Sequence, residues 1–481
     1  GGDLEGRGWN EKRSPIDGTL LGRFATADRA LVAEAVAAAK AAFPAWRATP
    51  LAERVRLSRR VAALLEERVY AIGAALSLEV GKNRMEALGE TQETADFFTG
   101  YAEDFARSGG FDRALADDPV KGPRSRNRSV LKPHGVWGVI SPFNFPLALA
   151  GGPTAAALVT GNTVVAKGAT DTPWATRLLA DCIRDAGYPP GVFNLVAGGG
   201  DEAGEALVGH PDLAGLTFTG SHAVGSALCR RMVAGGQWAR PCIAEMGGKN
   251  ACIVGASAAL ERAVPGIVRS AFGLSGQKCS AVSRIYVVAG VAERLVAGLV
   301  EATRALRVGD PTQRDHWMGP VINERAVANY LNHVRELDRH GGKILEGGRR
   351  LADGALRAGS YVAPTVATAP PDHPLYEVEM FLPVLMVAPV ASVAEGVARA
   401  NASALGLTAG CYGDAADVGY FLDHIEAGTV YVNRPQGATT GAWPWYQAFG
   451  GWKGSSSTNK AIGSFYYLPQ YLREQSQTVV E

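Results

Sequence analysis

Short runs of β-branched residues alternate with helical segments along the middle of this chain. The runs at 136–140, 163–166, 192–196 and 216–218 are rich in valine, threonine and leucine, and a helical pattern covers 174–186. Strands that alternate with helices at this pace favour βαβ units and a parallel sheet with helices on its faces. Such a sheet binds nucleotides at the carboxyl ends of its strands. We therefore expect a nucleotide-binding α/β fold.

A second α/β block follows in the C-terminal half. It comprises expected strands at 251–254 and 284–288 and expected helices at 260–274 and 291–306. Near the beginning of the chain, residues 26–78 place apolar side chains at spacings of three and four, which is typical of helices. A chain of 481 residues exceeds what one hydrophobic core usually supports, so two or three domains are expected.

The charges nearly balance, with 48 Lys and Arg against 47 Asp and Glu and a net charge of +1. No long run of either sign occurs, so we expect neither nucleic acid nor an anionic membrane surface as a partner. The most apolar stretch, 136–159, is interrupted by Pro142, Asn144, Pro146 and Pro153. A membrane span tolerates that combination poorly, so we interpret the stretch as a buried strand, a turn and a helix.

The six cysteines show no C-x-x-C spacing and no ladder typical of a disulfide scaffold. This pattern favours a reducing compartment, and we expect no metal site. The first residues lack a basic patch followed by an apolar segment, so no signal peptide is expected. Together these features predict a cytoplasmic protein.

One cysteine stands in a run of small residues that suggests catalysis. Cys279 ends Phe272-Gly273-Leu274-Ser275-Gly276-Gln277-Lys278-Cys279, and Glu245 opens the upstream run Glu245-Met246-Gly247-Gly248-Lys249. A thiol on a small-residue loop, with a carboxylate on a neighbouring segment, is the combination required for a covalent nucleophile served by a base. Taken singly, most cysteines are small buried hydrophobic residues, which is the alternative interpretation.

Four motifs in the same order resemble the aldehyde dehydrogenase superfamily. They are the two runs above together with Pro142-Phe143-Asn144-Phe145-Pro146 and Phe218-Thr219-Gly220-Ser221, and the likeness covers nearly the whole chain. The resemblance implies a Rossmann-type dinucleotide-binding domain with a parallel sheet (1–122 and 142–246) and a second α/β catalytic domain (247–435). It also implies a small β oligomerisation hairpin (123–141 and 455–481), with strand-like pieces at 127–133 and 463–475. The assembly implied is a homodimer or a dimer of dimers.

The resemblance also implies the catalytic roles. Cys279 would attack an aldehyde carbon, and Asn144 would donate to the alkoxide that forms. Glu245 would act as the general base that hydrolyses the thioester. Relatives that pass the acyl group to coenzyme A lack this Glu, so its presence favours the free acid as product. An Asn that only turns the chain and a Glu that only caps a helix are the alternatives.

The cofactor signal differs from G-x-G-x-x-G. The run from Phe218 to Gly225 follows an expected strand and opens a helix, so its backbone N–H groups and Ser221 could meet a pyrophosphate. By resemblance, NAD or NADP would contact Ser141, Pro142, Phe143, Lys167, Thr170, Gly220, Ser221, Gly225, Gly247, Glu379 and Phe381. NAD-preferring relatives carry a Glu where this chain has Thr170. Its absence removes a repulsion of the 2′-phosphate, so NADP is expected to be usable.

Within the superfamily the chain looks most like the 1-pyrroline-5-carboxylate (glutamate γ-semialdehyde) dehydrogenases. The runs Gln277-Lys278-Cys279-Ser280-Ala281 and Gln447-Ala448-Phe449-Gly450-Gly451 carry that likeness. It implies a carboxylate-bearing semialdehyde as substrate, with contacts from Glu93, Ser280, Gly441, Ala442 and Phe449. A different semialdehyde, an aliphatic or aromatic aldehyde, or a non-catalytic family member are the alternatives. A bulky aromatic run around Trp445, in a loop longer than usual, keeps these alternatives open.

Overall fold

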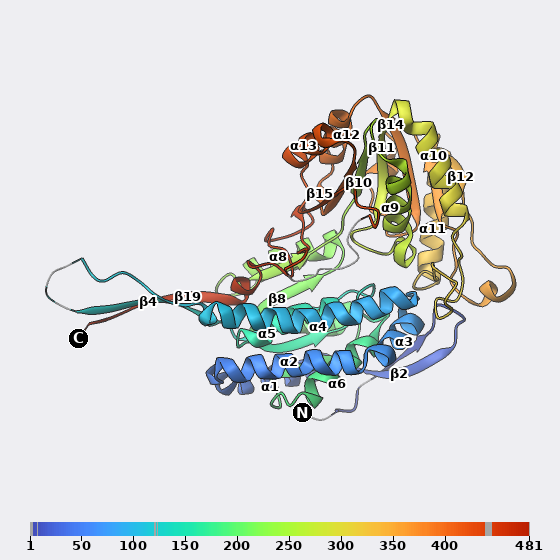
Figure 1. The fold of residues 1–481 in the computed structure, drawn as a ribbon. Helices are drawn as coiled ribbons and strands as arrows, with labels where there is room; N and C mark the ends of the chain where they lie inside the picture. The colour runs from blue at the N-terminus through green and yellow to red at the C-terminus, as the bar shows by residue number, and fades with distance from the viewer. Residues whose placement is uncertain (1–2, 7, 120–121, 123, 438–444, 481) are drawn as a thin grey trace.

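The computed structural model describes residues 3–6, 8–119, 122, 124–437 and 445–480. Two α/β layers and a projecting β ribbon make up the molecule (Figure 1). The first sheet has five parallel strands in the order β7-β6-β5-β8-β9. Its strands are β5 (Val136–Ile140), β6 (Thr163–Lys167), β7 (Phe193–Val196), β8 (Leu213–Thr219) and β9 (Cys242–Glu245). The alternation expected from the sequence is thus confirmed.

Helices cover both faces of this first sheet. One face carries α5 (Ala148–Val159) and α6 (Pro173–Asp185), with an outer layer of α2 (Leu51–Glu67), α3 (Val69–Val80) and α4 (Arg84–Arg107). The other face carries α1 (Arg29–Ala48), α7 (Glu205–Gly209) and α8 (His222–Ala234). The apolar spacing in 26–78 therefore forms three helices, as expected, and a hairpin of β1 (Gly8–Arg13) and β2 (Leu20–Thr26) precedes them.

The second sheet has seven strands in the order β12-β13-β14-β11-β10-β16-β17, and only the β12–β13 pair is antiparallel. Along β14, Leu385 and Val387 enter one core, whereas Val384, Met386 and Ala388 enter the other. Such two-sided burial is expected of a parallel strand that is covered on both faces. The strands are β10 (Asn250–Val254), β11 (Val282–Val288), β12 (Lys343–Glu346), β13 (Thr365–Thr368), β14 (Val384–Val390), β16 (Thr408–Tyr412) and β17 (Thr429–Val432).

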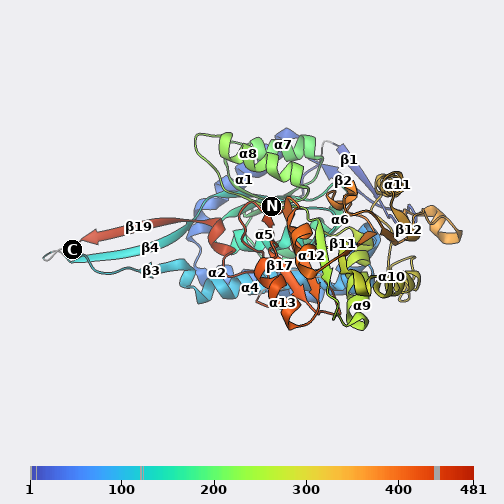
Figure 2. The ribbon, with the colours of Figure 1, turned by 90° about the horizontal axis from the view of Figure 1, so that it is seen from above.

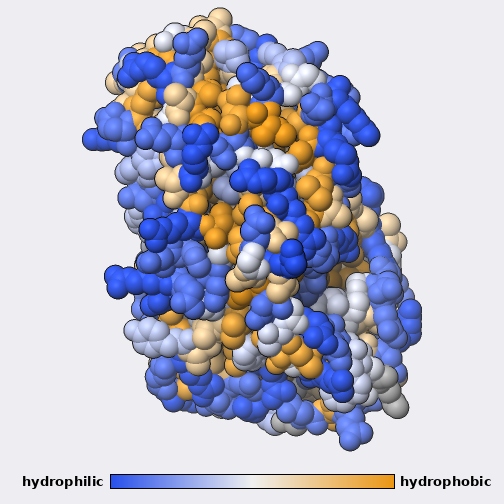
Figure 3. Space-filling view, turned by 90° about the vertical axis from the view of Figure 1, so that its right-hand side faces the viewer, coloured by the Kyte–Doolittle hydropathy of each residue, from blue (hydrophilic) through white to orange (hydrophobic). Residues whose placement is uncertain are grey.

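Two sets of helices cover the second sheet. On one face lie α9 (Leu260–Phe272) and α10 (Ala289–Arg304), and on the other lie α11 (Glu324–Arg339), α12 (Val393–Asn401) and α13 (Ala415–His424). On the side of the molecule near α10 and α11, hydrophilic side chains surround apolar patches, mostly in the upper part of the view (Figure 3). Within the described ranges, no helix is both long and apolar enough to cross a membrane.

A three-stranded antiparallel ribbon projects from the first layer. Its order is β19-β4-β3, with β3 (Asp112–Ala114), β4 (Ser125–Pro133) and β19 (Leu472–Val480), and both views show it extending away from the body (Figures 1 and 2). The strand expected at 463–475 is wrong over 463–471. Gly463 has a φ of 78°, and Leu468–Tyr471 form a short 3-10 helix that contains Pro469, which cannot donate to a strand ladder.

One expected boundary also needs correction. Residues 136–140 were assigned to the oligomerisation segment, but β5 is the central strand of the first sheet, between β6 and β8. Trp137 on β5 is fully buried, and its Nε1 donates to Thr217 Oγ1 at 2.9 Å. The Tyr471 hydroxyl lies 3.0 Å from the same Thr217 oxygen. The strand and the C-terminal segment therefore share one core, and the ribbon begins before β5.

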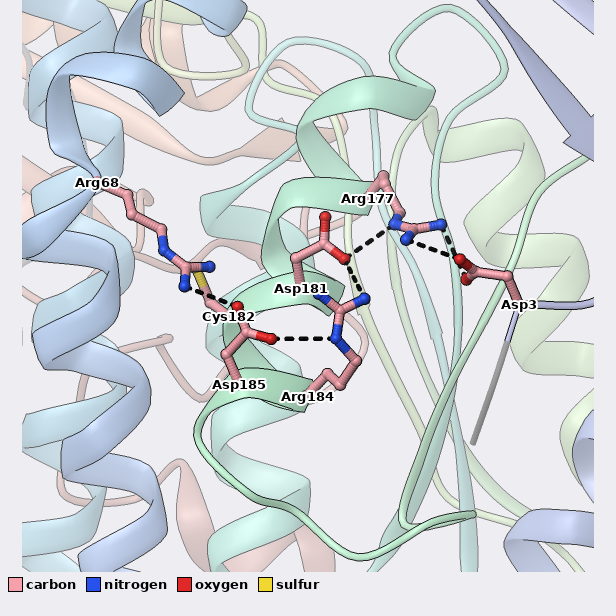
Figure 4. A network of polar contacts seen from close by, with 7 residues as sticks. All are labelled: Asp3, Arg68, Arg177, Asp181, Cys182, Arg184 and Asp185. Carbon is pink, nitrogen blue, oxygen red and sulfur yellow. Dashed lines mark hydrogen bonds and ion pairs between the residues drawn. The ribbon is translucent and has the colours of Figure 1, made fainter.

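The first layer is tied to the N-terminal segment by a chain of ion pairs along α6 (Figure 4). Arg177 pairs with Asp3 at 2.9 Å and with Asp181 at 3.1 Å. Farther along, Arg68 at the end of α2 pairs with Asp185 at 2.7 Å. Exposed ion pairs of this kind each stabilise a fold by about 0–1 kcal/mol. They therefore add little to the stability of the protein and mainly set the relative position of the two segments.

Candidate active site

The predicted nucleophile, Cys279, is half-buried on a loop between α9 and β11. The loop follows three consecutive residues with left-handed backbone, namely Leu274 (φ 48°), Ser275 (φ 54°) and Gly276 (φ 69°). A Cβ on Gly276 would lie 2.5 Å from the Leu382 carbonyl, so only glycine fits there. Left-handed backbone costs a non-glycine residue about 1–3 kcal/mol and persists only where its surroundings impose it. The loop is therefore held in one shape.

Asn250 clamps the backbone at Cys279 and two residues beyond it. Its Nδ2 donates to the carbonyl oxygens of Cys279 at 2.6 Å and Ala281 at 2.9 Å. Its Oδ1 accepts from the Thr408 N–H at 2.9 Å. Asn250 and Thr408 open the neighbouring strands β10 and β16, so the amino edge of the second sheet sets the position of Cys279.

The predicted base, Glu245, ends β9 at the carboxyl edge of the first sheet. Its side chain is buried, and Oε1 accepts from the Ser456 hydroxyl at 2.8 Å. Oε2 has no hydrogen-bond partner among the described residues. Burial raises the pKa of Glu245 from 4.5 to about 8, although the Ser456 hydroxyl and the nearby Gly451 backbone act in the opposite direction. One carboxyl oxygen is therefore held by a hydrogen bond, while the other is buried without a partner among the described residues.

The Cys279 thiol and the Glu245 carboxyl group lie close enough for their charges to interact. Burial, followed by the negative charges of Glu379 and Glu245, raises the pKa of Cys279 from its ordinary value to about 12. In the protein alone, both Cys279 and Glu245 are thus protonated at neutral pH. A positive charge that enters the site favours the thiolate, because it offsets these carboxylates. The structure brings these two predicted catalytic residues together.

Asn144 lies in the loop between β5 and α5 and is 3% exposed. The residues around it are firmly placed. Lys82 Nζ lies 3.5 Å from the centre of the Phe145 ring and forms a buried ion pair of 2.6 Å with Glu90. Glu90 in turn accepts from the Leu147 N–H at 2.9 Å, at the beginning of α5. This loop is therefore anchored to α4, although the donor role of Asn144 stays a prediction.

The same loop meets the second layer through two predicted cofactor residues. Phe143 packs edge-on against Phe381, with ring centres 5.8 Å apart. Phe381 has a φ of 55°. Pro142 lies directly before Phe143 and is half-buried. The contact brings the loop after β5 to the segment that contains Glu379, so a ligand between them would touch both layers.

The carboxyl ends of β5 and β6 offer polar groups to a ligand. The Ser141 N–H donates to the Lys167 carbonyl at 3.1 Å, while the buried Ser141 hydroxyl has no partner among the described residues. Lys167 ends β6, and its Nζ donates to the Gly168 carbonyl at 2.9 Å. Burial lowers the pKa of Lys167, and Asp201 opposes that effect. An unsatisfied hydroxyl beside a buried lysine fits a hydroxyl-rich ligand such as a dinucleotide.

Helix α8 begins at the predicted pyrophosphate motif. Ser221 is its N-cap and accepts from the Val224 N–H at 3.4 Å, and the Gly220 N–H donates to the Glu245 carbonyl at 3.1 Å. A Cβ on Gly225 would lie 2.6 Å from Met246 Sδ, so this glycine lets the helix approach the end of β9. A helix N-terminus at the carboxyl edge of a parallel sheet is suited to bind phosphate.

Thr170 lies at the exposed rim of the same edge. Its hydroxyl donates to the Gly198 carbonyl at 3.3 Å, and its own carbonyl accepts from Asn10 Nδ2 at 2.7 Å. The Thr170 side chain brings no negative charge to this position. The preference between NAD and NADP stays a prediction.

Glu379 sits directly over the Gly247-Gly248 turn. Its Oε1 accepts from the Gly248 N–H at 3.0 Å, and a Cβ on Gly247 would lie 1.9 Å from Oε2. Burial raises the pKa of Glu379, while the Gly248 hydrogen bond and the Lys249 charge lower it. Gly247 is therefore required for the carboxylate to lie where it does.

The predicted substrate residues are only partly placed. Glu93 is buried on α4, and Ser280 is buried next to Cys279, where its carbonyl accepts from Thr408 Oγ1 at 3.3 Å. Phe449 is half-buried and exchanges two backbone hydrogen bonds with Ile462, at 2.8 and 3.0 Å. Gly441 and Ala442 lie outside the described residues.

Comparison with known proteins decides the family. The sequence profile described as "Aldehyde dehydrogenase family" matches residues 5–476. The chain belongs to the aldehyde dehydrogenase family. This finding confirms the expected α/β fold and the expected activity of an NAD(P)-dependent aldehyde dehydrogenase, with an aldehyde as its substrate.

Individual relatives of this aldehyde dehydrogenase cover nearly all of the chain. It is 37% identical over 469 residues to a 1-pyrroline-5-carboxylate dehydrogenase of Geobacillus thermodenitrificans, covering 96% of this chain and 88% of that protein. It is 35% identical over 436 residues to an alpha-ketoglutaric semialdehyde dehydrogenase of Bacillus subtilis, covering 90% and 86%. The solved 1-pyrroline-5-carboxylate dehydrogenase from Thermus with bound NAD superposes with a TM-score of 0.93 at 33% identity, covering 99% and 91%.

Three contributors to the site were missed from the sequence. Asn250 clamps the Cys279 loop, Ser456 holds Glu245, and Lys82 anchors the loop of Asn144. The run Ser455-Ser456-Ser457 could have signalled a polar role, because three consecutive serines in a segment otherwise rich in glycine are unusual. Lys82 offered no signal, since its importance comes only from complete burial beside Glu90.

Proposed function

We propose that this aldehyde dehydrogenase oxidises a carboxylate-bearing semialdehyde, glutamate γ-semialdehyde in particular, to the carboxylic acid. The observation that carries the proposal is the pairing of a clamped thiol with a buried carboxyl that keeps one oxygen free. The substrate class rests on the relatives, two of which are named for 1-pyrroline-5-carboxylate and for alpha-ketoglutaric semialdehyde, compounds that both carry a carboxylate. The likeness around Ser280 and Phe449 supports the same class.

The residues divide the reaction between them. The Cys279 thiolate attacks the aldehyde carbon and forms a thiohemiacetal, and the Asn144 amide and the Cys279 N–H would donate to the oxygen. Bound NAD(P)⁺ supplies the hydride acceptor and a positive charge. Loss of hydride leaves a thioester on Cys279. The anchored loop of Asn144 and the clamp of Asn250 keep the reacting atoms in place through both steps.

Glu245 is proposed to complete the cycle. Its free Oε2 would take a proton from a water that attacks the thioester, which releases the acid and returns the thiol. A base with a pKa near the working pH combines adequate ionisation with strong proton affinity, and about 8 lies in that range. The product is therefore the free acid and not an acyl transfer product.

The proposal also assigns each cofactor residue to one part of the dinucleotide. Lys167 and Thr170 would meet the adenosine ribose, Ser221 and the beginning of α8 would meet the pyrophosphate, and Glu379 would meet the nicotinamide ribose. Because Thr170 brings no carboxylate, NADP would be accepted as well as NAD.

The larger units follow from the same proposal. The first layer would be the dinucleotide-binding domain, the second layer the catalytic domain, and the ribbon of β3, β4 and β19 the contact between subunits in a homodimer or dimer of dimers. The exposed edge of β19 supports a pairing role, because an unpaired strand edge readily adds another strand. All six cysteines are free thiols, which supports the cytoplasm as the compartment.

Steady-state kinetics test the proposal. The kcat/KM for glutamate γ-semialdehyde should exceed that for succinic semialdehyde and for a simple alkanal of equal length, with either NAD⁺ or NADP⁺ as cofactor. Cys279→Ala should abolish turnover with all three aldehydes, while Cys182→Ala, on α6 in the core of the first layer, serves as the matched control. Retained turnover in Cys279→Ala would contradict the covalent route, and a preference for the alkanal would contradict the substrate class.

A further inference from the structure

Two cysteines that the proposed reaction does not use touch each other at the edge of the first layer. Cys229 lies on α8, and Cys242 is the first residue of β9. Their Sγ atoms are 3.2 Å apart, and both side chains are half-buried, so small solutes can reach them. The S–S distance in a disulfide is about 2.0 Å. An approach of roughly 1.2 Å between the sulfur atoms would therefore join them.

The other thiols lie in different surroundings. Cys252 and Cys411 are completely buried in the cores of the second layer, which keeps oxidants away from them. Cys182 is completely buried and contacts the Arg68 guanidinium at 3.7 Å (Figure 4). Cys279 is the nucleophile. The Cys229 and Cys242 pair thus combines proximity with exposure.

The surroundings of the pair favour a reactive thiolate. The Cys242 S–H, the Ser457 hydroxyl and the Arg230 charge all lower the pKa of Cys229, outweighing the effect of partial burial. The same contact raises the pKa of Cys242. One sulfur is thereby prepared to attack, and the other keeps its proton until the second step. The thiolate is the form of cysteine that reacts with peroxides.

We propose that Cys229 and Cys242 form an oxidisable dithiol that hydrogen peroxide converts into an intramolecular disulfide between α8 and β9. The Cys229 thiolate attacks one peroxide oxygen, the O–O bond breaks, and Cys229 becomes a sulfenic acid as hydroxide leaves. The Cys242 sulfur then attacks the sulfenic sulfur, and its proton leaves with the hydroxyl as water. Two thiols are oxidised, and hydrogen peroxide is reduced to two molecules of water.

The disulfide would link two elements that both lead to the candidate active site. Helix α8 begins at Ser221, and β9 ends at Glu245. Ser457 Oγ donates to the Cys242 carbonyl and accepts from the Ala244 N–H, both at 2.8 Å, and its neighbour Ser456 holds Glu245. The new bond would also close the segment 230–241, which comprises the end of α8 and an exposed turn at 235–239. Closing a loop restricts the unfolded chain, so the oxidised protein should unfold at a higher temperature.

Peptide mapping of the full chain tests the proposal. The protein with Cys279→Ser, which removes the catalytic thiol, is treated with a small molar excess of hydrogen peroxide and then alkylated under denaturing conditions. We expect a mass loss of about 2 Da, a cross-linked peptide pair containing Cys229 and Cys242, and reversal by dithiothreitol. The melting temperature should rise on oxidation and return on reduction.

Cysteine-to-serine variants distinguish the possible results of the peroxide treatment. Cys229→Ser and Cys242→Ser should each prevent the mass loss and the rise in melting temperature, whereas Cys182→Ser should change neither. With Cys279 intact, both variants should keep the aldehyde dehydrogenase activity of the reduced enzyme, so failure of the dithiol is distinguishable from failure of the proposed function. A protein in which both cysteines stay reduced, or in which Cys229 proceeds to the sulfinic acid without a cross-link, overturns the inference.

Discussion

Replacing the proposed base, Glu245, by its neutral isostere should stabilise this enzyme while it disables it. Glu245→Gln keeps the shape of the side chain and can still accept the Ser456 hydrogen bond of 2.8 Å. It cannot ionise. The pKa of Glu245 is about 8 in the folded protein against an ordinary value of 4.5. At about 1.4 kcal/mol for each pH unit, ionising the buried carboxyl therefore costs the folded state about 5 kcal/mol.

The sign of the effect follows from the direction of the change in pKa. Folding raises the pKa of Glu245. What its neutral form contributes to the free energy of unfolding is therefore fully present below pH 4.5 and is lost as the pH rises through about 8. Glu245→Gln should thus match the parent protein in free energy of unfolding near pH 4.5. Its advantage should grow to about 3 kcal/mol at pH 7 and level off at about 5 kcal/mol above pH 8.

Urea unfolding of the two proteins at several values of pH between 5 and 9 measures this difference. In parallel, stopped-flow absorbance at 340 nm follows reduction of the cofactor. Because hydride transfer precedes hydrolysis, Glu245→Gln should keep a burst of about one equivalent per site, while steady-state turnover falls by about a hundredfold or more. A stability difference that stays constant with pH would refute the reasoning about burial, and full steady-state turnover would refute the role of the base.

Three further substitutions test the supporting residues. Lys82→Met leaves the Glu90 carboxylate buried without its partner at 2.6 Å, so the free energy of unfolding, measured in urea, should fall by about 3–5 kcal/mol. An unchanged free energy of unfolding would mean that this ion pair does not stabilise the fold. Asn250→Ala removes the donor to the Cys279 carbonyl, so kcat should fall by about tenfold or more while KM for the cofactor changes little. A change in KM without a change in kcat would argue against the clamp. Thr170→Glu adds a carboxylate where the adenosine ribose is proposed to bind. It should lower the ratio of kcat/KM for NADP⁺ to that for NAD⁺ by about tenfold. An unchanged ratio would place the 2′-phosphate elsewhere.

The sequence alone shows the spacing of apolar residues and the chemistry of short motifs. The features of the protein that depend on these two properties were therefore predictable. The alternation of short apolar runs with helical segments predicted the strands β5 to β8 and helix α6, because a strand buried on both faces needs a continuous apolar run. The pairing of Cys279 with Glu245 was predictable because each stands in a run of small residues that leaves room for a reactant. Phe143 and Phe381 were assigned to one cofactor site, and the structure brings them into contact.

Other features depend on which segments meet in space, and only the tertiary structure decided them. Burial sets the pKa of Glu245, and the hydrogen bond that offsets it comes from Ser456, which is distant in sequence. Asn250 clamps the Cys279 loop only because β10 and β16 are neighbours in the second sheet. The sequence shows Cys229 and Cys242 as two isolated thiols, and their contact exists because α8 packs against β9. A sequence pattern records which side chains are available, whereas desolvation and hydrogen bonding depend on what surrounds them after folding.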